Sequence, residues 1–228
     1  MGEWLGTDCL YDAAQEPVAL LLLAHGAGAA MDSDFMNAMA AALASQSVAV
    51  LRFEFPYMQR RRYEQRQFPP DRAPKLLSAF AARVEQAHTL AGELCGTGNE
   101  SLPLWIGGKS MGGRMASMLA AEGADIAGVV ALGYPFHPVG KPEKTRIAHL
   151  TDLAVPMLIC QGERDSFGKP DEVAGYNLPG LVQVHWLSVG DHDFKPLKRS
   201  GLKQQDLIQE SARASSAFMQ KSVPAINR

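Results

Sequence analysis

The sequence predicts an α/β fold in which a mostly parallel β-sheet carries helices on both faces. Short runs of aliphatic residues alternate along the chain with stretches of helical periodicity, which is the pattern of repeated strand–helix units. The run at residues 17–24 is apolar without alternation, as expected for a strand buried on both faces. The 228 residues contain no internal repeat, low-complexity tract or linker, so we expect one domain over residues 1–228.

The expected elements follow one another in a regular order. A weak edge strand is assigned to the first sixteen residues, and residues 57–73 are expected to form a polar loop. We expect strands over residues 17–24, 47–53, 102–107, 126–132, 155–160 and 181–187, and helices over residues 34–46, 74–94, 113–122, 170–176 and 202–220.

Composition and charge exclude several classes of protein. A net charge of −2 gives no reason to expect nucleic-acid binding. The three cysteines form no CxxC pair, so we expect neither zinc nor disulfides, and a reducing cytoplasmic compartment. The apolar run at 18–24 is too short to span a membrane, and residues 1–51 lack the Lys or Arg of a signal peptide. We expect no cofactor, no metal and no membrane partner, and the sequence indicates no oligomeric state.

Gly108-x-Ser110-x-Gly112 is the first candidate for catalytic chemistry. It lies where an expected strand meets an expected helix, the place where a tight turn exposes a nucleophilic serine. Met111 would then offer its backbone N–H to a developing oxyanion at the helix N-terminus. A phosphate-binding loop would need glycine where Pro103 stands, which argues against a nucleotide site. A serine that merely caps the helix remains the alternative.

The loop from His25 to Gly28 follows the first buried strand and is expected to complete an oxyanion hole. Its donor would be the N–H of Ala27, while His25 either orients the loop or packs in the core. A dinucleotide fingerprint is the rival interpretation. Met31 stands where that motif requires its third glycine, which argues against it.

A base and an acid are expected in the last two loops at the carboxyl edge of the sheet. His192 follows the strand at 181–187, and Asp165 follows the strand at 155–160, on the side where the serine would emerge. Glu163 is the alternative acid. A metal site on Asp191, His192 and Asp193 is disfavoured because adjacent residues converge poorly on one ion.

Five arginines lie between residues 60 and 72, and we favour a solvated, flexible loop there. The alternative is that Arg60, Arg61 and Arg62, with Lys109 and His25, bind an anionic ester. About twenty residues separate the strands ending at 132 and beginning at 155, which predicts a minimal lid and a modest substrate.

Five segments form a recognisable set: Ala24-His25-Gly26-Ala27-Gly28, Phe55-Pro56-Tyr57, Gly108-Lys109-Ser110-Met111-Gly112-Gly113-Arg114, Gly162-Glu163-Arg164-Asp165 and Gly190-Asp191-His192. Together they resemble the α/β-hydrolases that include dienelactone-hydrolase-like bacterial proteins, a testis-expressed eukaryotic relative and a chromatin-complex subunit. The resemblance covers nearly the whole chain, although Ser110 stands where dienelactone hydrolases proper have cysteine. It implies the α/β-hydrolase fold and a triad of Ser110, Asp165 and His192.

The function expected from these residues is cleavage of a small carboxylic ester or thioester through an acyl-enzyme on Ser110. Two other functions fit the same sequence. One is an acyltransferase or peptidase that uses the same three residues, and the other is a non-catalytic interaction module that retains the fold.

Overall fold

A computed structural model describes residues 2–5, 8–95 and 101–222. Within them, eight strands form one sheet in the order β1-β2-β4-β3-β5-β6-β7-β8. The β1–β2 and β2–β4 pairs are antiparallel and all other pairs are parallel, which confirms the mostly parallel sheet. The strands are β1 (Glu3–Leu5), β2 (Cys9–Asp12), β3 (Ala19–Ala24), β4 (Val48–Phe53), β5 (Leu104–Lys109), β6 (Gly128–Leu132), β7 (Met157–Gly162) and β8 (Val182–Leu187).

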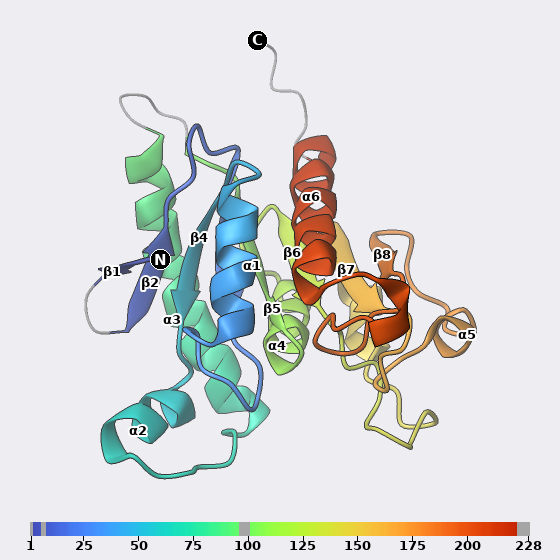
Figure 1. The fold of residues 1–228 in the computed structure, drawn as a ribbon. Coiled ribbons are helices and arrows are strands. Elements are labelled where there is room, and N and C mark those ends of the chain that lie inside the picture. The colour runs from blue at the N-terminus through green and yellow to red at the C-terminus, as the bar shows by residue number, and fades with distance from the viewer. Residues whose placement is uncertain (1, 6–7, 96–100, 223–228) are drawn as a thin grey trace.

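Helices cover both faces of this sheet (Figure 1). Helices α1 and α6 pack against each other on one face, and α3 packs against α4 on the other. The short α5 and the 3₁₀ helices η1 and η2 lie in connecting segments. The helices are α1 (Asp34–Ala44), α2 (Pro56–Glu64), α3 (Ala73–Leu94), α4 (Met111–Ala121), η1 (Ala148–Asp152), α5 (Pro170–Val173), η2 (Lys198–Ser200) and α6 (Gln204–Ser222).

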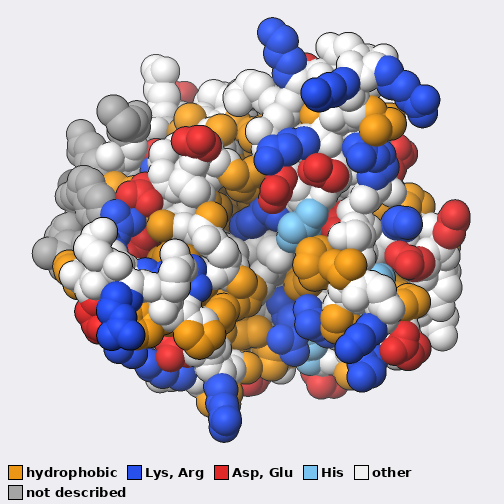
Figure 2. Space-filling view, turned by 60° about the horizontal axis from the view of Figure 1, so that its bottom comes forward, with side chains coloured by type: hydrophobic (Ala, Val, Ile, Leu, Met, Phe, Trp, Pro, Cys, Tyr) orange, Lys and Arg blue, Asp and Glu red, His pale blue; other side chains and the backbone are white. Residues whose placement is uncertain are grey.

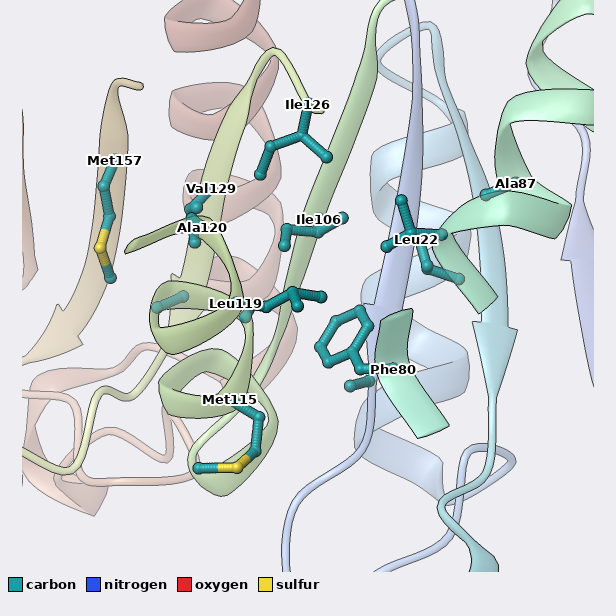
Figure 3. Packing of buried hydrophobic residues seen from close by; sticks show 14 of the residues in the cluster. Leu22, Phe80, Ala87, Ile106, Met115, Leu119, Ala120, Ile126, Val129 and Met157 are labelled. Atoms are coloured by element: carbon teal, nitrogen blue, oxygen red, sulfur yellow. The ribbon is translucent and has the colours of Figure 1, made fainter. Parts of the chain in front are cut away.

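Strand β3 is apolar throughout because both faces of the sheet are covered there. Leu20 and Leu22 of β3 belong to the core under α3 and α4, whereas Leu21 and Leu23 belong to the core under α1 and α6. Figure 3 shows Leu22 in the first of these cores, close to Phe80 of α3. Full burial of each such leucine contributes about 1.5–3 kcal/mol. The sheet therefore forms a rigid platform for the loops at its ends.

Helix α2 differs from the sequence prediction, because its residues were expected to form part of a flexible loop. That prediction is wrong for residues 57–64, which are helical. Pro56 begins the helix at a position where proline is favoured, and Arg60 pairs with Glu64 one turn later. Only Tyr57 and Met58 of α2 are buried, so the helix lacks the apolar periodicity that would have revealed it.

The carboxyl ends of the parallel strands lie at the lower edge of the sheet in Figure 1, and Figure 2 looks onto this edge. Basic, acidic and hydrophobic side chains are mixed on this face, which is hollowed near its centre (Figure 2). Residues 133–156, between β6 and β7, contain η1 as their one helix, in accordance with the minimal lid. Among the described residues, no helix combines the length and apolar character needed to cross a bilayer.

Candidate active site

Ser110 occupies the turn between β5 and α4, and its backbone is strained. Its φ of 51° and ψ of −111° lie outside the regions that L-residues favour, and its N–H donates to the carbonyl of Leu132 at 2.9 Å. The turn is tight because glycines flank it. A Cβ at Gly108 would lie 2.5 Å from the carbonyl carbon of Gly112, and one at Gly112 would lie 2.6 Å from the oxygen of His25. The arrangement is a tight strand–serine–helix turn, the geometry that can expose a serine hydroxyl above a sheet.

His192 lies between Ser110 and Asp165, although the three residues come from different loops. Its Nε2 is 3.0 Å from Ser110 Oγ, and its Nδ1 is 2.7 Å from Asp165 Oδ2. The buried carboxylate can only accept, so Nδ1 carries a proton and Nε2 is left to accept the serine hydroxyl. The imidazole is 23% exposed, whereas the carboxylate is fully buried. The imidazole next to Ser110 is therefore accessible from solvent, whereas the carboxylate behind it is not.

The Asp165 carboxylate is held by further donors. Its Oδ1 accepts the N–H of Phe167 at 2.9 Å, and its Oδ2 also accepts from Gln161 Nε2 at 3.0 Å. Gln161, which the sequence analysis did not single out, is anchored in turn by the N–H of Tyr134 at 2.6 Å. Glu163, the alternative acid, accepts from the Ser188 hydroxyl and the Val189 N–H instead. The structure thus brings Asp165, and not Glu163, to the imidazole.

Lys109 lies beneath the loop that carries His192, and not at the surface. It is 7% exposed, and its Nζ donates to the carbonyl oxygen of His192 at 2.7 Å. The same ammonium lies 3.5 Å from Asp193 and 5.4 Å from the centre of the Phe35 ring. Burial lowers the pKa of Lys109, and the charge of Asp193 opposes that shift. The contact with His192 was not foreseen from the sequence, which proposed Lys109 only as a ligand for substrate.

Hydrogen bonds from the side chains of His25 and Tyr57 hold the loop after β3. His25 is buried, with Nδ1 2.7 Å from the carbonyl oxygen of Gly26 and Nε2 accepting the N–H of Phe55 at 3.1 Å. These partners require a neutral ring with its proton on Nδ1, and burial lowers the pKa of His25 accordingly. The Tyr57 hydroxyl donates to the carbonyls of Gly26 and Ala27. His25 therefore supports the loop and does not face a ligand.

A cavity of about 370 Å³ opens in front of Ser110. Ala27, Phe35, Phe167 and His192 are among the residues that line it. Met111 is the first residue of α4, where backbone N–H groups have no acceptor within the helix. Ala27 thus lines the same cavity as Ser110, and Met111 follows the serine directly in the chain; their role as oxyanion donors stays a prediction.

The arginines of α2 make their contacts within the protein. Arg60 pairs with Glu64 at 2.9 Å. Arg61 donates to the carbonyl of Phe68, and Arg62 pairs with the buried Glu54 at 2.6 Å and with Asp32 at 2.9 Å. Each of the three arginines thus has a partner within the protein, although Arg60 uses only its Nε and is 54% exposed. Their role in binding an anionic ester stays a prediction. Among the described residues, no group of three or more His, Cys, Asp or Glu side chains could hold a metal ion.

Comparison with known proteins places this arrangement in a family. Residues 17–220 match the family model described as alpha/beta hydrolase domain. No curated protein sequence matches the chain.

Solved structures with the same fold cover most of the chain. An alpha-beta serine hydrolase homologue from Coxiella burnetii has a TM-score of 0.68 at 17% identity, over 91% of this chain and 90% of that chain. Dienelactone hydrolase from Anabaena variabilis has a TM-score of 0.65 at 20% identity, over 93% and 90%. A serine hydrolase without lid from Xanthomonas campestris has a TM-score of 0.60 at 19% identity, over 96% and 90%.

These neighbours confirm the α/β-hydrolase fold and the similarity to dienelactone hydrolases. The narrower resemblance to the testis-expressed and chromatin-complex relatives stays a prediction. With the family model matched over nearly the whole described chain, this protein belongs to the alpha/beta hydrolase domain family.

Proposed function

We propose that this chain is a serine hydrolase that cleaves a small carboxylic ester or thioester through an acyl-enzyme on Ser110. The observation that carries the proposal is the continuous hydrogen-bonded series from the Ser110 hydroxyl through His192 to the buried carboxylate of Asp165, with separations of 3.0 and 2.7 Å. A serine hydroxyl becomes a nucleophile when a base takes its proton and an acid fixes the base's tautomer.

In the first half of the reaction, Ser110 Oγ attacks the ester carbonyl carbon while its proton passes to Nε2 of His192. The carbonyl oxygen becomes negative and accepts hydrogen bonds from the N–H groups of Ala27 and Met111. When the tetrahedral intermediate collapses, the bond to the leaving group breaks, and the imidazolium protonates the departing alcohol or thiol. Asp165 stabilises the imidazolium throughout and keeps its own charge.

In the second half, water attacks the acyl carbon and gives its proton to Nε2 of His192. The acyl–Oγ bond then breaks, the proton returns to Ser110, and a carboxylic acid leaves. The short segment between β6 and β7 supports a small substrate, because η1 is the one helix in residues 133–156 and it packs against α4. We therefore expect short acyl groups to be preferred.

Hydrolysis of p-nitrophenyl acetate, butyrate and decanoate tests the proposal. The wild-type protein is expected to cleave the two short esters faster than decanoate, with a burst of p-nitrophenol as the acyl-enzyme forms. Ser110→Ala is expected to lower kcat by a factor of about 10³ or more. Unchanged hydrolysis by Ser110→Ala would refute the assignment of the nucleophile, and preference for decanoate would refute the small substrate. Product analysis with amine and alcohol acceptors separates hydrolysis from acyl transfer.

A further inference from the structure

The face of α4 that begins at Ser110 carries a second polar side chain one turn later. The N–H of Arg114 donates to the carbonyl of Ser110 at 3.1 Å, and the hydroxyl of Ser117 donates to the carbonyl of Arg114 at 2.9 Å. Residues three and four apart share one face of a helix, and their side chains lean towards its N-terminus. The backbone of Arg114 is therefore only about 6 Å beyond that of Ser110 along the helix axis.

The segment between β6 and β7 brings a second arginine to this face. The Tyr134 hydroxyl donates to the carbonyl of Arg146 at 2.9 Å, and the N–H of Arg146 donates to the carbonyl of Phe136 at 2.7 Å. The same segment places His149 Nε2 2.8 Å from the Ser117 hydroxyl. Ser117 of α4 thus contacts this segment at His149 and, with the two hydroxyl oxygens 3.5 Å apart, at Tyr134. Arg146 is held to the segment between them, close enough for the charge of Arg114 to act on it.

The two guanidinium groups have no counter-charge in the part of the chain that the structure describes. Among residues 2–5, 8–95 and 101–222, no carboxylate lies within ion-pair distance of Arg114 or Arg146, and the buried Nε of Arg114 has no acceptor. Burial and the charge of Arg114 both lower the pKa of Arg146. Burial and Arg114 likewise lower the pKa of His149 to about 4, against the weaker influence of the exposed Asp152. Two close positive charges with an unsatisfied donor are the arrangement that an anion would neutralise.

We propose that Arg114 and Arg146 form an anion subsite beside Ser110, which binds a carboxylate or phosphate group on the substrate. The inference rests on the proposed hydrolase function and names its substrate class, an ester or thioester whose acyl part ends in an anionic group a short chain away from the scissile carbonyl. Planar guanidinium groups bind such anions through paired hydrogen bonds. Basic side chains are visible on the face of the molecule that holds the site (Figure 2).

This subsite replaces the arginines of α2 as the source of anion recognition. Arg60 and Arg62 pair with carboxylates, and Arg61 donates to a backbone carbonyl, so an anion there would have to displace existing partners. An anion at Arg114 would instead accept from a buried Nε–H that has no acceptor among the described residues.

A matched pair of esters tests the subsite. Mono-p-nitrophenyl glutarate and p-nitrophenyl pentanoate have five-carbon acyl chains and differ in the terminal carboxylate. The wild-type protein is expected to show the lower KM for the glutarate ester. Arg146→Gln and Arg114→Lys are expected to raise that KM, by about tenfold for Arg146→Gln, and to change the KM for pentanoate less than twofold. Arg199→Gln, a substitution of an exposed arginine on η2, serves as the control. Equal effects on both esters, or none, would overturn the inference.

A direct binding measurement distinguishes an incorrect anion subsite from an incorrect hydrolase assignment. Calorimetry on Ser110→Ala with mono-p-nitrophenyl glutarate is expected to detect binding that Arg146→Gln weakens about tenfold. If no ester is hydrolysed but this binding is seen, the subsite stands and the hydrolase proposal fails. If both esters are hydrolysed without preference and the binding is absent, the subsite alone is refuted. Competitive inhibition by glutarate or by inorganic phosphate then distinguishes carboxylate from phosphate as the recognised group.

Discussion

Replacement of Lys109 by methionine is expected to lower kcat without destabilising the fold. The ammonium of Lys109 holds the carbonyl oxygen of His192 at 2.7 Å, and so fixes the backbone that carries the base. A hydrogen bond from a charged donor contributes about 1.5–3 kcal/mol. If the whole of that is expressed in positioning the imidazole, the rate falls by a factor of about 10 to 150. Methionine has a similar length and fills the same space.

The stability change is expected to be small because two effects oppose each other. Loss of the ammonium leaves the His192 carbonyl without its donor, at a cost of about 1–3 kcal/mol. Removal of a charge that is only 7% exposed relieves a desolvation penalty of several kcal/mol, part of which Asp193 had offset. We therefore expect the free energy of unfolding of Lys109→Met to stay within about 1 kcal/mol of the wild-type value or to rise.

Steady-state kinetics on p-nitrophenyl butyrate, with urea unfolding of the same preparations, checks both expectations. The matched control is Lys195→Met, since Lys195 also lies near Asp193, at 3.8 Å, but is 61% exposed. The control is expected to keep kcat within about twofold, because exposed ion pairs contribute little. The positioning role would be refuted if Lys109→Met kept the wild-type kcat, including the case in which kcat/KM falls only because KM rises.

Three further predictions follow from contacts elsewhere in the molecule. Asp165→Asn is expected to lower kcat by about 10³–10⁴-fold, whereas Glu163→Gln, at the acid that does not touch the imidazole, is expected to stay within about threefold, as measured by ester hydrolysis. Gly108→Ala is expected to destabilise the fold by about 3 kcal/mol or more, because the added Cβ would clash with the backbone. Gly92→Ala is expected to stabilise the fold by about 0.5–1 kcal/mol, because nothing lies within 4 Å of the added Cβ and alanine favours the helix. Urea unfolding measures both changes. Burial and the charge of Arg114 lower the pKa of His149 from 6.5 as a free side chain to about 4 in the folded state, so between these pH values protons bind preferentially to the unfolded chain. Between pH 7 and pH 4 the free energy of unfolding of the wild type is therefore expected to fall by about 1–2 kcal/mol more than that of His149→Gln, after allowance for partial exposure. Equal losses in the two proteins, measured by urea unfolding at both pH values, would contradict this.

Strands β3 to β7 could be predicted because each is a short, largely apolar run that is buried throughout, whereas the edge strand β8 is only partly buried. Their boundaries were less accurate at the site itself. The strand expected at 102–107 runs from Leu104 to Lys109, because Gly108 and Lys109 pair in parallel with Ala131 and Leu132 of β6. That pairing depends on a neighbouring strand and leaves no signal in the local pattern.

The candidate nucleophile, acid and base could be named because they stand at fixed places after three strands. The residues that hold these three side chains in place could not be named from the sequence, because their contacts form only in the folded structure. Lys109 meets the carbonyl of His192 from a strand three places earlier in the chain, and Gln161 points from β7 to the carboxylate of Asp165. The anion subsite was equally hidden, because Arg114 and Arg146 become neighbours only when the segment after β6 folds onto α4.

Labelling with a fluorophosphonate shows whether His192 activates the hydroxyl of Ser110. We expect one label per chain, located on Ser110 by peptide mass spectrometry, and labelling of His192→Gln that is slower by a factor of about 10³ or more. Absence of labelling, labelling at another residue, or an equal rate in the two proteins would contradict it, and absence of labelling would favour the non-catalytic interaction module.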